Sequence, residues 1–263
     1  MVGKRVRSAL VIAPIVFLAA WFGGPFYAIA VATTAGLGAL EFYGMAGFPR
    51  RHPRTWSGQL CILSFILLAH FEGPYTASLL AAVAVIPLAW IILRRPGRRS
   101  LINWAWTVAG ILYLGWMLSR LIPLRELADG REWVILTLFT IFAADTSAFF
   151  VGRAWGRHRL APTISPSKTW EGAGGGFVGA IAASLILAAI MGLSIPYWQV
   201  VVLGVLIAIF SQLGDLAESK FKRAAGVKDS GTLIPGHGGM LDRLDSVVFT
   251  IVVVYYYVIW VLI

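Results

Sequence analysis

Residues 197–223 read YWQVVVLGVLIAIFSQLGDLAESKFKR, an apolar run that ends in a short charged segment. About 20 consecutive apolar residues suffice for a helix to cross a bilayer, so the run predicts a membrane-spanning helix. Acids at the end of such a span are costly unless they are paired or hydrated, which marks Asp215 and Glu218 as candidates for an ion site. An interfacial patch of salt bridges is the open alternative for each acid taken singly.

The exit of this span carries a polar face. In a helix, Asp215, Ser219 and Lys222 fall at i, i+4 and i+7, so a carboxylate, a hydroxyl and an ammonium lie on one side. Gln212 and Glu218 flank Asp215 at i−3 and i+3. The spacing therefore predicts a functional site at this end of the helix.

The composition of the whole chain is that of a membrane protein. Its 263 residues are 59% hydrophobic and 13% charged, with a mean hydropathy of +0.80, whereas soluble domains have about 25% charged residues. The first apolar run, residues 9–22, resembles a signal peptide. We expect it to be retained as a span, because the basic residues alternate between the two sides of the membrane only if this run is counted. The sequence predicts an all-α polytopic fold of nine spans, near residues 8–22, 25–46, 57–71, 74–93, 101–119, 132–151, 172–192, 197–218 and 245–262.

The basic residues predict how these spans are oriented. With the N-terminus in the cytoplasm, 19 of the 22 Lys and Arg residues fall on the cytoplasmic side, as the positive-inside rule requires. The others are Arg120, Arg125 and Arg131. We expect a multi-pass protein of the cell inner (plasma) membrane with its C-terminus outside and its active site facing the cytoplasm. The net charge of +10 then needs no nucleic acid as a partner.

We expect one transmembrane domain over residues 1–263, because no linker or fixed repeat divides the chain. Within it, the N-terminal helices of residues 1–130 are poor in acids, and Glu41 is the only acid there inside a predicted span. From Asp145 onward, acids, glycines and bases gather at the cytoplasmic ends of the last four predicted spans, so we expect residues 131–263 to be the catalytic part. The single cysteine, Cys61, excludes an intrachain disulfide, and scattered histidines without an H-E-x-x-H motif argue against zinc.

Residues 224–240 contain five glycines and a proline, so they are predicted to form a loop. Glycines let backbone amides approach a phosphate closely. Lys228, Asp229 and His237 are set among them, although a lone histidine in a loop is more often structural than catalytic.

The loop leads into the last span, whose first turns carry Asp242 and Asp245. Carboxylates suit the positive end of a helix dipole, so helix capping is the simple explanation of both. Alternatively, Asp242 and Asp215, at the facing ends of two helices, hold Mg²⁺ together, since this ion prefers oxygen ligands.

Residues 165–172 read SPSKTWEG and predict the start of a helix, with Ser165 as its N-cap and a proline at the next position. Lys168 would then stand at a helix N-terminus, a ready site for an anion. The glycines of residues 172–179 are expected to be helix-packing positions, because no strand precedes them as in a dinucleotide fingerprint. Asp145, an acid within a span, is a further functional candidate.

At these positions the chain resembles the phosphatidate cytidylyltransferase family, also called CDP-diacylglycerol synthases. The family's signature has the form S-x-x-K-R, then K-D, then P-x-H-G-G-x-x-D-R-x-D, and residues 219–223, 228–229 and 235–245 match every fixed position. Residues 165–172, residues 212–219 and Asp145 also resemble family positions. The likeness covers about residues 145–246, whereas the N-terminal half resembles the family only in its hydrophobic layout.

The resemblance implies the reaction of CTP with phosphatidic acid to give CDP-diacylglycerol and pyrophosphate, in an integral membrane homodimer that lies among membrane lipid. It also implies a divalent metal, Mg²⁺, held by Asp215 and Asp242, with a second cation left open; Asp215, Lys222 and Asp242 would be catalytic. The substrate-binding residues would be Lys168, Ser219, Arg223, Lys228, Asp229, His237 and Arg243. The remaining residues, in supporting or undecided roles, are Asp145, Ser165, Glu171, Gln212, Glu218 and Asp245.

Two other functions are considered. The same nucleotide motifs fit an enzyme that activates a different phospholipid with CTP, because acyl recognition depends on apolar grooves that carry no motif. An ion-coupled transporter predicts acids deep in several spans and mirrored halves, whereas the acids here crowd at one end of the later spans.

Overall fold

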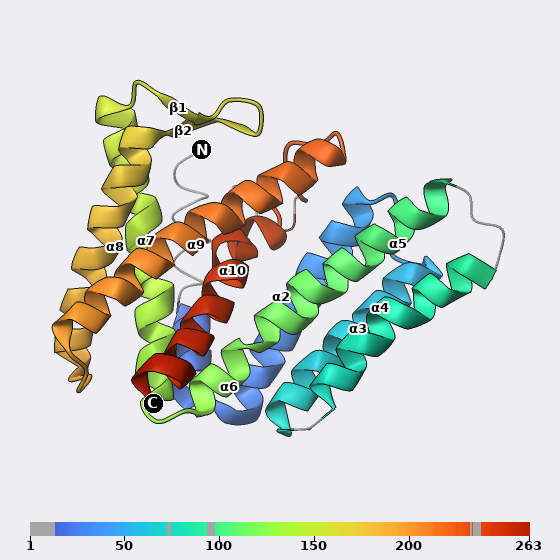
Figure 1. Ribbon diagram of the computed structural model, residues 1–263, viewed down its shortest axis with the longest axis horizontal. Helices are drawn as coiled ribbons and strands as arrows, with labels where there is room; N and C mark the ends of the chain where they lie inside the picture. The colour runs from blue at the N-terminus through green and yellow to red at the C-terminus, as the bar shows by residue number, and fades with distance from the viewer. Residues whose placement is uncertain (1–13, 73–74, 94–97, 232, 234–237) are drawn as a thin grey trace. The chain divides into compact units, whose positions relative to one another are not determined.

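The computed structural model describes residues 14–72, 75–93, 98–231, 233 and 238–263, and nearly all of its regular structure is helical (Figure 1). A first helix covers residues 14–22 of the described chain. The elements that follow are α2 (Gly24–Met45), α3 (Pro53–His70), α4 (Thr76–Leu93), α5 (Arg98–Gly110), η1 (Ile111–Met117), α6 (Leu121–Glu126), α7 (Gly130–Trp155), β1 (Arg159–Ala161), β2 (Ser165–Thr169), α8 (Trp170–Met191), α9 (Tyr197–Ala224), α10 (Leu241–Tyr257) and η2 (Val258–Leu262).

Six helical stretches of the described chain are long and apolar enough to cross a membrane, which confirms the predicted class of membrane protein. Each overlaps one predicted span. The helices α3 and α4 also form where spans were predicted, but they are not among the six. The total of nine therefore stays a prediction. The six stretches are Gly24–Met45, Ser100–Glu126, Gly130–Trp155, Trp170–Met191, Tyr197–Ala224 and Leu241–Leu262.

The helices belong to two compact units, and unit 1 comprises Met1–Pro123 and Asp229–Asp242. Within it, α2 packs on α3, and α3 packs on η1. The buried ring of Tyr43 on α2 occupies space left by Gly58 of α3 and Gly110 of α5, because a Cβ atom at either glycine would overlap the ring. These contacts fix the position of α2, the helix that carries Glu41, within unit 1.

Unit 2 comprises Leu124–Lys228 and Arg243–Ile263. In it α8 packs along α7 on one side and against α9 on another. Small residues allow this approach, since Ala144, Ala180 and Ala208 form a buried cluster at the meeting of the three helices. A Cβ atom on Gly176 would lie 3.2 Å from the Ala144 carbonyl oxygen. The same closeness to α7 is found at Gly172, Gly175 and Gly179, so the predicted packing role is confirmed at these three positions and at Gly176, whereas a Cβ atom on Gly174 would meet nothing within 4 Å.

One prediction at the start of α8 is wrong. Ser165 does not cap a helix: Ser165–Thr169 form β2, which pairs antiparallel with β1. The helix begins at Trp170, and Thr169 is its N-cap, with the Thr169 Oγ1 accepting a hydrogen bond from the Gly172 N–H at 3.1 Å. The residue before a proline favours extended backbone, which a strand and an N-cap share, so the sequence did not separate the two. The hairpin adds a small β element to the predicted all-α fold. The expectation that no strand precedes the glycines of α8 is also wrong, because β2 ends directly before that helix.

Replacing Thr169 by alanine is expected to destabilise the start of α8 by about 1 kcal/mol, because the substitution removes the acceptor of the cap. The midpoint of thermal unfolding in detergent should fall for this variant. Thr169→Ser keeps the hydroxyl, so its midpoint should stay close to that of the unaltered protein. Equal midpoints for the alanine and serine variants would contradict the assignment of the cap.

Candidate active site

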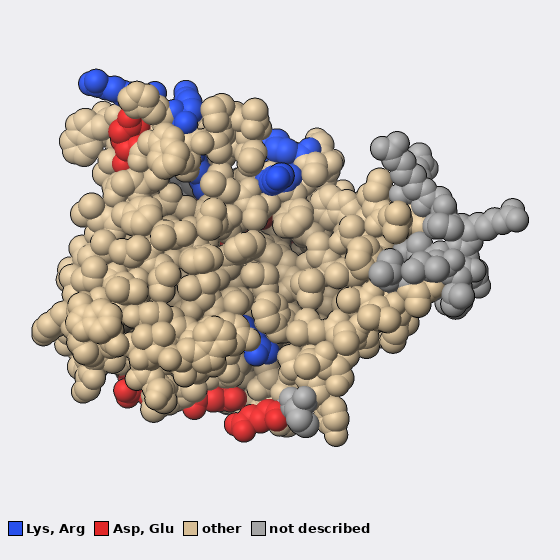
Figure 2. Space-filling model, in the orientation of Figure 1, with Lys and Arg blue, Asp and Glu red and all other residues tan. Residues whose placement is uncertain are grey.

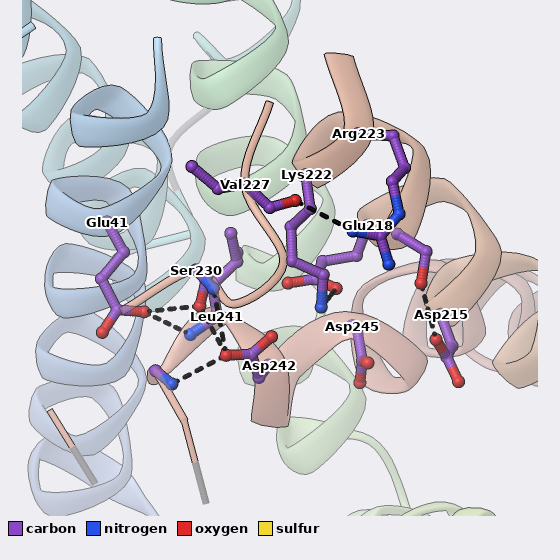
Figure 3. Close-up of polar contacts among 12 residues, drawn as sticks. Glu41, Asp215, Glu218, Lys222, Arg223, Val227, Ser230, Leu241, Asp242 and Asp245 are labelled. Atoms are coloured by element: carbon purple, nitrogen blue, oxygen red, sulfur yellow. Dashed lines mark hydrogen bonds and ion pairs between the residues drawn. The ribbon is translucent and has the colours of Figure 1, made fainter. Parts of the chain in front are cut away.

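The polar face predicted on α9 is present in unit 2 (Figure 3). The Asp215 Oδ2 forms an ion pair with the Lys168 Nζ at 2.6 Å, and the Asp215 Oδ1 accepts a hydrogen bond from the Ser219 Oγ at 3.3 Å. Lys168 comes from β2, so a strand and not a helix N-terminus delivers this cation to the carboxylate. Three of the predicted site residues are therefore in direct contact.

One turn further along α9, Lys222 forms an ion pair with Glu218. The Glu218 side chain has an exposed fraction of 0% and that of Lys222 12%, so the pair is buried. A buried carboxylate is costly without a matching charge, and this fixes the Lys222 ammonium in place. Arg223 next to it donates to two carbonyl oxygens, to that of Val227 at 3.1 Å and to that of Ile164 at 3.3 Å. The bond to Ile164 joins the end of α9 to the β1–β2 hairpin.

Two further acids of unit 2 lie near Asp215. Asp145 on α7 and Asp245 on α10 are each within electrostatic range of Asp215 and of one another, and Arg243 is within range of both. The helices α9 and α10 touch here, because a Cβ atom on Gly214 would overlap the Asp245 carbonyl oxygen. Carboxylates from three helices thus gather in one region, although Asp145 and Asp245 were predicted only in supporting or undecided roles.

Gln212 and Glu171 have contacts that stabilise the local fold. The Gln212 Nε2 donates to the Ala173 carbonyl oxygen at 3.4 Å, which joins α9 to α8. Glu171 accepts hydrogen bonds from the backbone N–H groups of Arg157 and His158 at 3.1 and 3.2 Å, and it pairs with the His158 ring at 2.6 Å. Glu171 therefore holds the turn that precedes β1.

The other predicted residues lie apart from these contacts or beyond the described chain. Ser165 pairs with Ala161 in the hairpin. Lys228 and Asp229 are exposed where the glycine-rich loop begins. His237 lies outside the described residues.

A second group of contacts lies in unit 1, around Asp242. The Asp242 Oδ2 accepts hydrogen bonds from the Gly239 N–H at 2.7 Å, the Ser230 Oγ at 2.8 Å and the Ser230 N–H at 3.3 Å. Glu41 of α2 joins this group, because its Oε2 accepts from the Leu241 N–H at 2.9 Å and from the Ser230 Oγ at 3.2 Å (Figure 3). Glu41 was not among the predicted site residues. The feature that could have indicated Glu41 is the one that indicated Asp145, namely an acid within an apolar helix.

The chemistry of these groups suits a hard divalent cation, which binds carboxylate oxygens. Each carboxylate has about four lone-pair positions, so Asp215 can accept a cation in addition to Lys168 and Ser219. Within the part of the chain that the structure describes, no three His, Cys, Asp or Glu side chains are arranged to hold a metal ion. Asp215 belongs to unit 2 and Asp242 to unit 1, and their joint metal site stays a prediction.

Basic side chains gather at the end of unit 2 that carries the β1–β2 hairpin (Figure 2). Positive charge concentrated on one region of a protein attracts anionic ligands. The fold and these contacts define a class, that of helical membrane proteins with a charged site suited to phosphate groups.

Comparison with known proteins identifies the family. The model of the cytidylyltransferase family matches residues 3–261. A phosphatidate cytidylyltransferase of Brucella abortus is 34% identical over 260 residues, which cover 95% of this chain and 91% of that protein. One of a Synechocystis species is 33% identical over 286 residues, covering 97% and 96%, and one of Staphylococcus saprophyticus is 37% identical over 172 residues, covering 65% of each chain.

The chain therefore belongs to the cytidylyltransferase family, a family of nucleotidyltransferases. The resemblance found in the motifs is confirmed, and it extends through the N-terminal half, where the motifs gave only a hydrophobic layout. Glu41 thus lies in a part of the chain that the family also covers.

Proposed function

We propose that the protein transfers the cytidylyl group of CTP to phosphatidic acid, producing CDP-diacylglycerol and pyrophosphate in phospholipid biosynthesis. The observation that carries this proposal is the family match over residues 3–261, together with relatives named phosphatidate cytidylyltransferase that align with most of the chain. The cations gathered at the end of α9 support it, because both substrates carry phosphates.

In this reaction an oxygen of the lipid phosphate attacks the α-phosphorus of CTP. The bond from that phosphorus to the oxygen that bridges to the β-phosphorus breaks, and pyrophosphate leaves with the electron pair. The lipid phosphate is already ionised, so the protein mainly needs to align the reactants and neutralise charge. Lys222, held by Glu218, and Lys168, held by Asp215, supply fixed positive charge for this purpose. Ser219 and Arg223 bind phosphate oxygens beside them.

Asp215 and Asp242 would hold the divalent metal, which we assign as Mg²⁺, with a second cation still open. When bound, Mg²⁺ neutralises negative charge on the phosphates of CTP. The hydrogen bonds from Ser230 and Gly239 fix the orientation of the Asp242 carboxylate for this role. Lys228, Asp229, His237 and Arg243 complete the proposed substrate-binding set, and Asp145 and Asp245 stand beside Asp215.

The arrangement in the membrane follows from the same proposal. The protein forms one transmembrane domain of nine spans in the cell inner membrane, with the N-terminus in the cytoplasm and the C-terminus outside. The positive charge on the proposed cytoplasmic loops supports this orientation. CTP then reaches the site from the cytoplasm, and the lipid head group reaches it from the membrane surface. We also propose that two copies of the protein form a homodimer.

The test is release of pyrophosphate from CTP by the purified protein in detergent, with phosphatidic acid and Mg²⁺. We expect lipid-dependent release, and we expect Asp242→Asn to lower it by about 10³-fold. Gln59→Ala is the matched control, because Gln59 makes a polar contact elsewhere in unit 1, donating to the Gly36 carbonyl oxygen at 2.8 Å. This control should retain activity.

Two outcomes would overturn the assignment of phosphatidic acid. One is a folded protein that releases no pyrophosphate with several phosphatidic acids and cations. The other is release that depends on a different phospholipid, such as an isoprenoid or ether-linked one, which would favour that substrate instead.

A further inference from the structure

Glu41 connects α2 to a loop that lies about 200 positions later in the chain. Its Oε2 accepts hydrogen bonds from the Ser230 Oγ at one end of this loop and from the Leu241 N–H at the other. The two donors are separated from Glu41 by 189 and 200 residues. All of these groups belong to unit 1. One carboxylate therefore holds both ends of the loop.

Two glycines show how closely the loop surrounds this carboxylate. A Cβ atom on Gly231 would lie 2.6 Å from the Glu41 Oε1 and 2.8 Å from its Cδ. A Cβ atom on Gly239 would overlap the Glu41 Oε2 and the Ser230 Oγ. Such separations are shorter than real Cβ contacts, so only glycine fits at either position without a shift of the carboxylate. The backbone at these two positions is thus shaped around Glu41.

The hydrogen bond from the Leu241 N–H to Glu41 stabilises a helix N-terminus, because Leu241 is the first residue of α10. The first N–H groups of a helix have no partner within the helix, and a negative charge there is favourable. Leu241 has an exposed fraction of 0%, so its N–H group needs a partner from the protein. Glu41 supplies that partner and stabilises the start of the helix on which Asp242 is the next residue.

Ser230 links the two acids directly. Its Oγ lies 2.8 Å from the Asp242 Oδ2 and 3.2 Å from the Glu41 Oε2, so the two carboxylates share its single hydroxyl proton. The Ser230 N–H donates to the same Asp242 oxygen. The position of Ser230 therefore affects the orientation of the Asp242 carboxylate, and Glu41 restrains Ser230.

We propose that Glu41 is a positioning residue for Asp242: it holds Ser230 and the N-terminus of α10, and thereby fixes the Asp242 carboxylate in the orientation that binds the divalent cation. This inference rests on the proposed role of Asp242 in the transferase reaction. The contact between Glu41 and the loop can nevertheless be measured without that reaction.

The experiment compares Glu41→Ala, Glu41→Gln and the Gln59→Ala control in the full-length protein. The first readout is the Mg²⁺ concentration that half-activates pyrophosphate release. Loss of a group that orients a metal ligand typically costs 10- to 100-fold, so Glu41→Ala should raise this concentration by about 10-fold or more. The KM for phosphatidic acid should change little. Glu41→Gln retains an acceptor oxygen for the Leu241 N–H and should recover much of the loss, while Gln59→Ala should match the unaltered protein.

The second readout is amide hydrogen exchange, which needs no activity. In Glu41→Ala, the segment 238–242 should exchange faster, because the Leu241 N–H loses its acceptor. Segments of α9 should exchange at an unchanged rate in Glu41→Ala. In the Gln59→Ala control, exchange should change only in α2 and α3, the helices that the contact between Gln59 and Gly36 joins.

A double substitution tests direct contact between Glu41 and the loop. The three atoms nearest to a Cβ on Gly231 all belong to Glu41, so Gly231→Ala should displace the carboxylate and raise the Mg²⁺ requirement. In the Glu41→Ala background the same change should have little further effect, because the atoms that it would contact are gone. Additive effects of the two substitutions would contradict the proposal.

The two possible failures are distinguishable. If the unaltered protein releases no lipid-dependent pyrophosphate, the proposed function fails, while the exchange experiment still reports on Glu41. If the unaltered protein is active but Glu41→Ala leaves both the Mg²⁺ requirement and the exchange of residues 238–242 unchanged, the positioning role is wrong.

Discussion

Replacing Asp215 by asparagine is expected to lower the kcat/KM for CTP by about 10³-fold or more. Asparagine has nearly the same shape, so the hydrogen bond with Ser219 can persist, but the side chain no longer carries the charge that pairs with Lys168 and that would bind a divalent cation. The measurement is pyrophosphate release over a range of Mg²⁺ and CTP concentrations. The variant should also lose any stabilisation that Mg²⁺ gives to the unaltered protein in a thermal unfolding experiment.

Lys168→Met is the matched comparison, because it removes the other member of the same ion pair. We expect a smaller loss, of about 10- to 100-fold, with a raised KM for CTP and with the thermal effect of Mg²⁺ retained. If Asp215→Asn keeps activity within about tenfold of the unaltered protein, Asp215 does not bind the metal that the reaction requires.

Replacing Lys222 by methionine is expected to destabilise the protein by about 3–5 kcal/mol and to abolish its activity. The stability loss arises because Glu218, whose side chain has an exposed fraction of 0%, loses the cation that offsets the cost of its burial. The free energy of unfolding in mixed micelles with a denaturing detergent measures the first effect, and pyrophosphate release measures the second.

A second substitution separates these two effects. In Lys222→Met with Glu218→Gln, both charges of the pair are removed, so most of the lost stability should return. Activity should not return, because the ammonium that we propose to bind the phosphates is still missing. A double variant that is as unstable as Lys222→Met alone would show that burial of the Glu218 charge is not the cause.

The sequence predicts those parts of the molecule that depend on local pattern. The position of the α9 span and the shared face of Asp215 and Ser219 follow from the length of an apolar run and from helical periodicity, and both are found. The prediction of a loop before Asp242 also holds in the described chain, because it depends on glycine and proline.

Other parts depend on competition between similar local preferences or on distant partners. Ser165 is in extended backbone, which a helix N-cap also adopts, but here that backbone pairs with the three-residue strand β1 in a hairpin. So short a strand has no detectable alternation of its own. Glu41 shows the second difficulty. Its partners are about 200 residues away, and no spacing within α2 indicates which distant amide an acid will meet.

The distance in sequence between Glu41 and Leu241 bears on how the protein is made. A ribosome completes α2 long before it reaches the loop, so the acid enters the bilayer ahead of the hydroxyl and the amide that it later binds. An acidic side chain in an apolar environment is unfavourable, and the early intermediate bears this cost until residue 241 has left the ribosome. Nascent chains that stop short of this point keep the penalty, because the amide that Glu41 binds is missing from them.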